Sequence, residues 1–564
     1  MVALVFTYQA VRTALALREA RSESAQLKDD LRSGDAEGAV ESMRGIAAAS
    51  RTAHEHSENI LWDATAKVPW LGHNIEAVQV VAEVLDTTSA SALPSAVKLS
   101  SALTGDRLRS EEGRFDLDVI GRLSPQFDGV AEPLRTADHD LGGVDPHGLV
   151  SPVRRLTVGL TGEVQDLRST VEAGAAVTRL MPSMLGADGP RQYLLVVQNN
   201  AEIRSTGGLP GSLSILRANN GRLELTSQRS GLDFHIFRRP VLPLSAGERA
   251  LYGKNLGVDV RDTNLTPDFP RSAALMSAML EKTHGQRVDG VLSVDPVALS
   301  EVLRAIGPTK VDGETFGSGN VVSKLLNLAY ERFDNQELQN AYFSTAARGI
   351  FEAFTSGHVN QQVAVRKLAK VASQRRLLVW SRHGDEQKYI DGTAISGELP
   401  NDTGDVPNVG MYLNDGTAGK IEYFLDYTGS LESLGCSREG VQRLESGMVL
   451  SSSVPHDVGR LSRWVTGFGE YAPKGSMRMT MRVYAPTGGK VTSLSANGAR
   501  IKFVTVEHDG RRVAVVPMLI RPGEEVRLSA SIQTRAGQRQ DPVLQWTPGM
   551  RSQASGKTAA SACA

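Results

Sequence analysis

Apolar residues recur at helical spacing along the first third of the chain. Between Ile75 and Thr88, for example, Val81, Ala82 and Leu85 fall on one face of a helix. Prolines and glycines interrupt this pattern at intervals, and such residues end helices. We therefore expect residues 36–185 to form a bundle of four to six antiparallel helices that acts as a stalk.

A strand pattern replaces the helical one near residue 186. Tyr193 to Val197 is a continuous apolar run, which is typical of a buried strand. Asn219-Asn220-Gly221 is a hairpin turn signal, and Asp295-Pro296 is an N-cap followed by a first-turn proline. Because hairpins and helical crossovers occur together, residues 186–400 are predicted to form an α/β domain with a mixed sheet.

Strict alternation of apolar and polar residues dominates the last third of the chain. Met477, Met479 and Met481 alternate with polar partners, as in a sheet with one exposed face. This pattern predicts an antiparallel β-sandwich-like domain over residues 401–548. The small polar residues of 549–564 predict disorder. The whole is a multidomain α+β chain of helical bundle, α/β domain with mixed sheet, and β-sandwich.

Composition limits the classes of partner. The 564 residues include 62 basic and 63 acidic side chains, for a net charge of -1. Hydrophobic residues make up 41% and charged residues 22%, as in soluble globular proteins. Nucleic acid is not an expected partner, because binding to it needs a basic surface. Two cysteines, Cys436 and Cys563, are too few for a disulfide framework or a cysteine-rich metal site.

The N-terminus allows two interpretations. Met1 to Phe6 is apolar, and Tyr8 and Arg12 follow. This run is far shorter than the roughly 20 apolar residues of a spanning helix, and it lacks the basic start of a signal peptide. Residues 1–35 are either the end of a truncated membrane helix plus a juxtamembrane helix, or a soluble amphipathic helix with an apolar end.

The densest polar cluster of the chain is the glycine-rich stretch from Gln198 to Ser212. It follows a buried strand, and α/β sheets place their sites at strand ends. We expect an exposed loop in which Arg204, Ser205 and Thr206 hold an anion. Alternatively, the side chains satisfy one another, with Arg204 paired to Glu202. Other ligand-binding candidates here are Asn199, Asn200 and Glu202.

Two further polar segments could contribute to a site. Asp262 and Asp268 could hold a magnesium ion through their carboxylates, although helix capping explains them equally well. Asn414 and Asp415 precede Lys420, which could neutralise a phosphate or pair with Asp415. That second segment also fits a plain hairpin turn. No P-loop, no G-x-S-x-G elbow and no H-E-x-x-H zinc helix occurs in the sequence.

The run from Tyr193 to Ser212 resembles the hallmark of a bacterial family, domain of unknown function 4012. Pro267–Pro270, Asp289–Pro296 and Tyr412–Lys420 also fit that family. Members typically carry a membrane helix before the helical segment. The resemblance implies a single-pass protein of the cell membrane with its bulk outside the cytoplasm, and a membrane partner for the N-terminal helix. The family has no established activity, so it assigns no catalytic residue.

A weaker likeness concerns the order of elements, which is similar to that of LytR–CpsA–Psr ligases. Those enzymes attach glycopolymers to the cell wall and hold a lipid pyrophosphate with arginines. The paired arginines and the aspartate of that family are not all present here, so the likeness is one of fold alone.

Two hypotheses follow. In the first, the chain is an uncharacterised envelope protein that presents its α/β domain to cell-wall or exopolysaccharide components. In the alternative, it is a phosphotransferase or glycopolymer ligase in which Arg204 binds a polyprenyl pyrophosphate and Asp262 or Asp268 holds magnesium. Clustering of Asn199, Arg204, Asp268 and Asn414 around one cleft would favour the enzyme. Dispersion of these residues, or burial of Arg204 against Glu202, would favour the first hypothesis.

Overall fold

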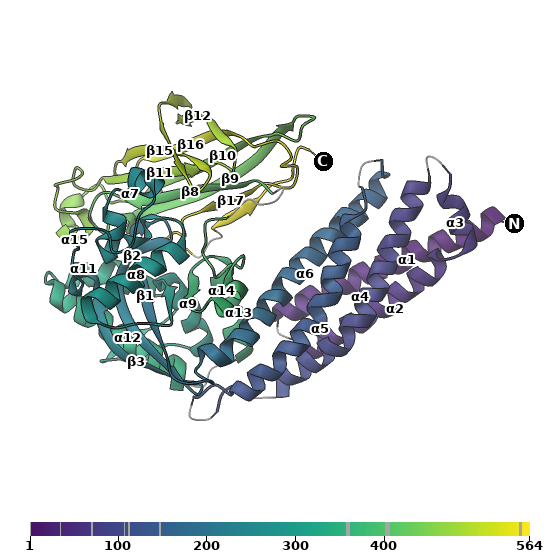
Figure 1. The fold of residues 1–564 in the computed structure, drawn as a ribbon, viewed down its shortest axis with the longest axis horizontal. Coiled ribbons are helices and arrows are strands. Elements are labelled where there is room, and N and C mark those ends of the chain that lie inside the picture. The colour runs from purple at the N-terminus through teal and green to yellow at the C-terminus, as the bar shows by residue number, and fades with distance from the viewer. Residues whose placement is uncertain are drawn as a thin grey trace. The chain divides into compact units, whose positions relative to one another are not determined.

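Two compact units make up the chain, residues 1–189 and residues 190–564. Figure 1 shows the first unit in purple and blue and the second in teal, green and yellow. The structure, a computed structural model, describes residues 2–33, 35–68, 71–105, 108–110, 113–145, 148–356, 361–400, 406–551 and 555–563.

The first unit is helical, as its apolar spacing predicts. Each long helix packs against the next long helix along the chain. Ala53, Val81, Ala82 and Ala131 are fully enclosed where the helices meet, and their small side chains allow close packing. The helices are α1 (Val2–Ser33), α2 (Ala36–Ser57), α3 (Ile60–Ala66), α4 (Gly72–Gly105), α5 (Leu117–Gly142) and α6 (Ser151–Met184).

The predicted transmembrane helix is wrong. Within the described residues, no helix combines the length and the apolar character needed to cross a bilayer. The apolar start of the chain belongs to α1, which continues through the charged residues Arg12, Arg18, Glu19 and Arg21. The same finding contradicts the predicted single-pass location in the cell membrane.

A mixed five-stranded sheet forms the middle of the second unit, which confirms the predicted α/β part. Its strand order is β3-β2-β1-β4-β7. β1 pairs antiparallel with β2 but parallel with β4, and β4 pairs antiparallel with β7. The strands are β1 (Arg191–Arg204), β2 (Gly207–Asn219), β3 (Arg222–Ser230), β4 (Gly290–Val294) and β7 (Leu377–Ser381).

Helices accompany this sheet. Phe269 and Met276 of α8 (Phe269–His284) share one apolar cluster with Leu194 of β1. α9 (Pro296–Ile306) begins as predicted, because Asp295 accepts a hydrogen bond from the Ala298 amide at 2.7 Å. The remaining helices and strands are α7 (Ala246–Tyr252), β5 (Thr309–Val311), β6 (Glu314–Phe316), α10 (Val321–Ser323), α11 (Ala329–Arg332), α12 (Gln336–Ser356), α13 (Gln361–Ser373) and α14 (Gly384–Ile390), with short 3-10 or π segments at Gly231–Asp233, Asn255–Gly257, Val260–Leu265 and Lys324–Leu328.

Two further sheets, of five and six strands, form the sandwich of the second unit. Their strand orders are β13-β12-β16-β10-β9 and β14-β15-β11-β8-β17-β18, and every pair except β17–β8 is antiparallel. The strands are β8 (Asn408–Asp415), β9 (Leu425–Cys436), β10 (Gln442–Ser452), β11 (Met477–Tyr484), β12 (Lys490–Ala496), β13 (Ala499–Ile501), β14 (Val504–His508), β15 (Arg511–Ile520), β16 (Glu525–Gln533), β17 (Val543–Trp546) and β18 (Gly556–Thr558), with short helical segments at Ile421–Phe424, Val458–Arg460 and α15 (Arg463–Thr466).

Alternating side chains of these sheets fill two different cores. Met479 and Met481 point into the cluster between the two sheets, where they meet Leu450 and Leu528. Tyr412 instead joins the cluster that contains α8 and β1. The sandwich and the α/β part therefore share a core of buried side chains. Figure 1 shows the green and yellow strands beside the teal elements.

The end of the chain is part of the sandwich, whereas its composition had predicted disorder. β18 pairs antiparallel with β17 at the edge of the six-stranded sheet. Cys436, at the end of β9, forms a disulfide with Cys563 across a sequence separation of 127. The two cysteines are thus too few for a framework, but they staple the C-terminus to the sandwich.

Candidate functional site

The polar stretch at 198–212 forms a bulged hairpin instead of the predicted exposed loop. β1 extends through Arg204, Ser205 and Thr206 make the turn, and β2 begins at Gly207. The pairing register shifts between Asn199 and Ile203, so three residues of β1 have no counterpart on β2. Such a bulge redirects side chains away from the regular alternation of a strand.

Most of the candidate side chains are buried in this arrangement. Arg204 is 8% exposed. Asn199, Asp268, Asp415 and Lys420 are only partly buried. The fully buried candidates are Asn200, Glu202, Arg204, Ser205, Thr206 and Asn414. We call residues 198–208, together with the side chains that surround them and are described in the next paragraphs, the hairpin network.

Gln198 holds the two strands of the hairpin together. Its Oε1 accepts hydrogen bonds from Thr206 Oγ1 at 3.1 Å, from the Gly208 amide at 2.9 Å and from Asn264 Nδ2 at 3.2 Å. Its Nε2 donates to Ser293 Oγ at 2.6 Å. One amide side chain thereby satisfies groups from the turn, from β4 and from the segment before α8.

The two asparagines of the bulge point to different partners. Asn199 Nδ2 donates to Tyr330 Oη at 2.7 Å, and Asn200 Nδ2 donates to Asp295 Oδ2 at 3.0 Å. Asp295 also accepts a hydrogen bond from Arg376 at 2.5 Å. Arg376 is buried, with 3% of its surface exposed. Asp295 therefore caps α9 and neutralises a buried cation at the same time.

Arg204 lies between two carboxylates. Its guanidinium is 3.4 Å from Asp262 and 3.8 Å from Asp415. Burial raises the pKa of Asp262, and the nearby charge of Arg204 counteracts that effect. The alternative pairing of Arg204 with Glu202 does not occur, because Glu202 pairs with Lys420.

Lys420 forms its ion pair with Glu202 rather than with Asp415. Its ammonium group also lies 5.2 Å from the centroid of the Tyr330 ring, a cation–π arrangement. Asp415 lies near Glu422 instead. Burial is the main cause that raises the pKa of Glu422 well above its ordinary value, and the charge of Asp415 adds to it. Each of two neighbouring carboxyl groups disfavours ionisation of the other.

The turn of the hairpin contacts the sandwich. The Ser205 amide donates to Asn414 Oδ1 at 3.2 Å, and Asn414 Nδ2 donates to Ser205 Oγ at 2.9 Å. Thr547 Oγ1 donates to the Ser205 carbonyl at 3.2 Å, and Ser205 Oγ donates to the Leu265 carbonyl at 2.7 Å. The hairpin network thus connects β1 and β2 to β8 and to the segment after β17.

Asp268 makes none of these contacts. It stands at the N-cap position of α8 without a capping hydrogen bond from its side chain. Burial raises its pKa to about 7, with further contributions from Asp509 and Glu398. Across the described parts of the chain, no three His, Cys, Asp or Glu side chains are arranged to hold a metal ion.

Sequence reasoning missed several members of the hairpin network. Tyr330, Arg376 and Glu422 carry no motif that distinguishes them, and each lies more than a hundred positions from the hairpin. Asp295 was identified, but only as a helix cap. The Arg375-Arg376 pair directly before a buried strand was the one signal available, since arginine at such a place needs a partner.

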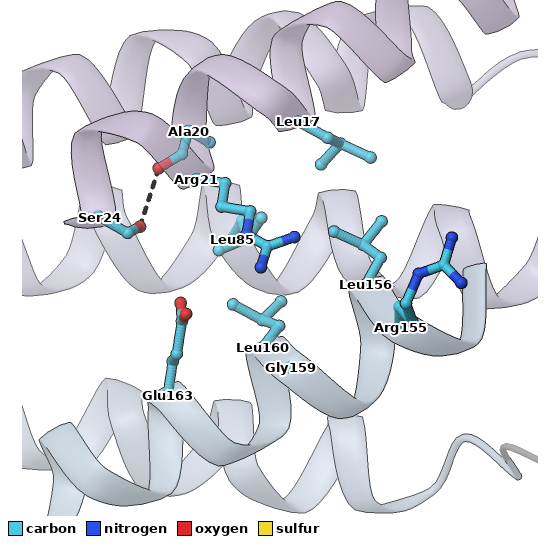
Figure 2. Close-up of a pocket in the computed structure, with 10 residues that line it drawn as sticks. All are labelled: Leu17, Ala20, Arg21, Ser24, Leu85, Arg155, Leu156, Gly159, Leu160 and Glu163. Carbon is cyan, nitrogen blue, oxygen red and sulfur yellow. Dashed lines mark hydrogen bonds between the residues drawn. The ribbon is translucent and has the colours of Figure 1, made fainter. Parts of the chain in front are cut away.

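Two crevices are present elsewhere in the structure. Figure 2 shows one in the helical unit, where Leu17 and Arg21 of α1 face Leu156 and Leu160 of α6, with Leu85 of α4 beside them. Its volume is about 20 Å³, which is room for a water molecule. The other is lined by residues 425–427, 546 and 549–551 of the sandwich. Neither is lined by a residue of the hairpin network.

Comparison with known proteins gives one match. Residues 188–330 match a family described as "Protein of unknown function (DUF4012)". No curated protein and no solved structure shows significant similarity to the chain. The matched range includes the bulged hairpin, Asp262, Asp295 and Tyr330, which means that most of the hairpin network lies inside it. The weaker likeness to LytR–CpsA–Psr ligases receives no support.

Proposed function

We propose, on the premise that residues 188–330 of this chain belong to the DUF4012 family, that the protein is a non-enzymatic binding protein. In this proposal the hairpin network connects the α/β part to the sandwich and has no ligand of its own; we call this role a structural joint. The α/β part is then presented to cell-wall or exopolysaccharide glycopolymers. Binding would then use the surface of the second unit instead of the polar motif.

The enclosure of Arg204 is the observation that carries this proposal. An arginine that binds a pyrophosphate needs free donors directed at the ligand. Arg204 is 8% exposed and already lies between Asp262 and Asp415. Lys420, the second cation of the network, is paired with Glu202. A pyrophosphate would have to displace carboxylates from both cations, which opposes the ligase alternative.

The contacts of Ser205 support a joint. They connect the hairpin to Asn414 of β8 and to Thr547 after β17. Hydrogen bonds between buried polar groups of distant segments favour one arrangement of the elements that they connect. The network is not fully satisfied, because Arg204 Nε and Asn200 Oδ1 have no hydrogen-bond partner among the described residues. The motif would therefore fix the sheet of the α/β part on the sandwich.

Parallel binding assays test the proposal. One measures retention of the chain on purified cell-wall glycopolymer, and the other measures calorimetric binding of farnesyl pyrophosphate with magnesium. We expect the wild type to bind the glycopolymer and not the pyrophosphate. An Arg222→Ala variant, which alters an exposed arginine of β3, should behave like the wild type.

Two results would overturn the proposal. Pyrophosphate binding that is lost in Arg204→Lys, with the thermal unfolding temperature unchanged, would make the motif a ligand site. Absence of glycopolymer binding in the folded wild type would exclude the proposed ligand class.

A further inference from the structure

The last part of the chain crosses from the α/β part to the edge of the sandwich. Arg376 donates to the carbonyl oxygens of Gly549 at 2.7 Å and Arg551 at 2.6 Å. The buried Ser555 donates to the Gln374 carbonyl at 2.8 Å. These contacts hold Gly549, Arg551 and Ser555 in place. We call residues 555–563, which begin at Ser555, the C-terminal strap.

The strap covers the edge strand of the six-stranded sheet. β18 pairs antiparallel with β17, with Gly556 opposite Gln545 and Thr558 opposite Val543. The Trp546 amide donates to the Ser555 carbonyl at 2.9 Å, and the Ala559 amide donates to the Pro542 carbonyl at 3.0 Å. Main-chain hydrogen bonds thus join β18 to β17. Beyond β18, Ser561 hydrogen-bonds to Arg539 and Asp541, and the Ala562 amide donates to Ser433 Oγ.

Side-chain packing contributes little to this pairing. Lys557 and Thr558 are exposed, and Gly556 has no side chain. By contrast, Leu544 and Trp546 of β17 are buried in the core of the sandwich. A three-residue strand without buried side chains is marginal on its own. β17 is therefore a stable part of the sheet, whereas β18 needs a tether to stay on it.

The disulfide supplies the covalent part of that tether. Cys563 is bonded to Cys436 at the end of β9, and both residues are only partly buried, so a thiol can reach the bond. A dithiol would reduce it by thiol–disulfide exchange. Two electrons and two protons pass from the dithiol to the cysteines, which leaves two protein thiols and one oxidised, cyclic disulfide of the reductant.

We propose that the edge of β17 is a binding site for an extended polypeptide strand, and that the disulfide-locked strap occupies and gates it. The occupant is indicated by the chain's own β18, which shows that an antiparallel strand fits residues 543–545. An uncovered edge presents unpaired N–H and C=O groups, and these recognise any extended backbone. Because the side chains of β18 face solvent, the site would tolerate varied sequences with small or polar residues.

The test is amide hydrogen exchange of the full chain in oxidised and dithiothreitol-reduced states. Reduction should accelerate exchange of the Leu544 and Trp546 amides by about tenfold or more, while β11 stays unchanged. Cys563→Ser should give the same result without reductant. A synthetic peptide with the sequence of residues 555–562 should then restore the protection of β17. Lys557→Ala, which alters an exposed side chain of the strap, should leave the oxidised chain closed.

Three outcomes would each contradict the proposal. Unchanged exchange at β17 after complete reduction would show that the strap does not depend on the disulfide. Faster exchange throughout β11 as well would make the disulfide a staple of the whole sandwich and not a gate. Open β17 amides that the peptide fails to protect would show that the edge does not bind a strand.

Discussion

Arg204 depends on carboxylates that come from two other segments of the chain. Asp262 precedes α8, and Asp415 ends β8. Removal of one partner from a buried ion pair is costly because the remaining charges lose their compensation. Substitution of Arg204 should therefore lower the free energy of unfolding more than substitution of a surface arginine does.

Arg204→Ala should lower the free energy of unfolding of the second unit by about 3 kcal/mol. Urea denaturation followed by tryptophan fluorescence measures this change. Arg222→Ala is the matched control, because Arg222 pairs with Glu224 at the surface and should cost less than about 1 kcal/mol. Equal effects of the two substitutions would show that the buried position of Arg204 is energetically unimportant.

Glu422 should make stability depend on pH. Burial and Asp415 raise the pKa of Glu422 in the folded state, so the folded protein keeps a proton that the unfolded chain releases. Stability from this group is present at low pH and declines as pH rises above the ordinary glutamate value. Glu422→Gln keeps a hydrogen-bond donor without the charge, and the variant should be more stable than the wild type at pH 8.

The measurement is urea denaturation of both proteins at several pH values from 5 to 8, roughly the range in which carboxyl groups with ordinary pKa values are already ionised. The difference between Glu422→Gln and the wild type should grow as pH rises. Glu432→Gln, at an exposed position of β9, serves as the control and should show a constant difference. A difference that shrinks with rising pH would mean that Glu422 is ionised in the folded protein.

The sequence identified the residues of the hairpin network better than their roles. Arg204, Asn414 and Asp415 were all recognised as unusual, since polar clusters after buried strands are rare. Their partners could not be predicted, because Lys420 meets Glu202 across 218 positions and Arg376 meets Asp295 across 81. Burial decides whether such a cluster faces a ligand or itself, and burial depends on packing between distant segments.

The β1–β2 hairpin is the element on which the hairpin network is built. Gly208 lies against the backbone of the bulge, where an added Cβ would be closer than 3.0 Å to atoms of Asn199 and Asn200. Gly207 adopts a φ of 141°, which other residues rarely reach. Two of the glycines that suggested a ligand loop, Gly207 and Gly208, are therefore required by the backbone geometry of the hairpin.

Gly208→Ala should destabilise the second unit by more than about 2 kcal/mol or prevent its folding, since backbone atoms would have to move. Chemical denaturation and soluble yield measure the effect. At Gly384, the first residue of α14, an added Cβ meets nothing within 4 Å. Gly384→Ala should change stability by less than about 0.5 kcal/mol or raise it slightly. Similar stability of both variants would contradict the close packing at the hairpin.

Local signals predicted other elements well. Asn220 and Gly221 form the turn between β2 and β3 with positive φ values of 45° and 79°, as the hairpin signal requires. Asp295 caps α9 at the predicted place. Both features depend on a few adjacent residues, whereas the bulged hairpin and the C-terminal strap depend on partners far away in the sequence. That difference explains which elements could be predicted.

For the whole molecule, the order of a helical part, a mixed sheet and two antiparallel-rich sheets follows from periodicity, and the predicted fold class is confirmed. The membrane helix was predicted from a short apolar run and a family resemblance, and it is wrong because α1 is too charged along its length. An apolar end does not make a span when the same helix continues into charged residues.

The two compact units should unfold independently. Among the described residues, each cluster of buried apolar side chains belongs to one unit: two lie in residues 1–189 and three lie in residues 190–564. Cooperative unfolding requires a shared core, so calorimetry of the full chain should give two transitions. A fragment of residues 190–564 should melt within about 3 °C of the corresponding transition of the full chain.

Leu134→Ala assigns the transitions. Leu134 is 4% exposed in the core of the helical unit, and its truncation should cost about 2 to 5 kcal/mol there. In the full chain, only the transition of residues 1–189 should move to a lower temperature. The transition of residues 190–564 should keep its temperature. If both transitions moved to lower temperature, the stability of each unit would depend on the other. The prediction of independent unfolding would then be wrong.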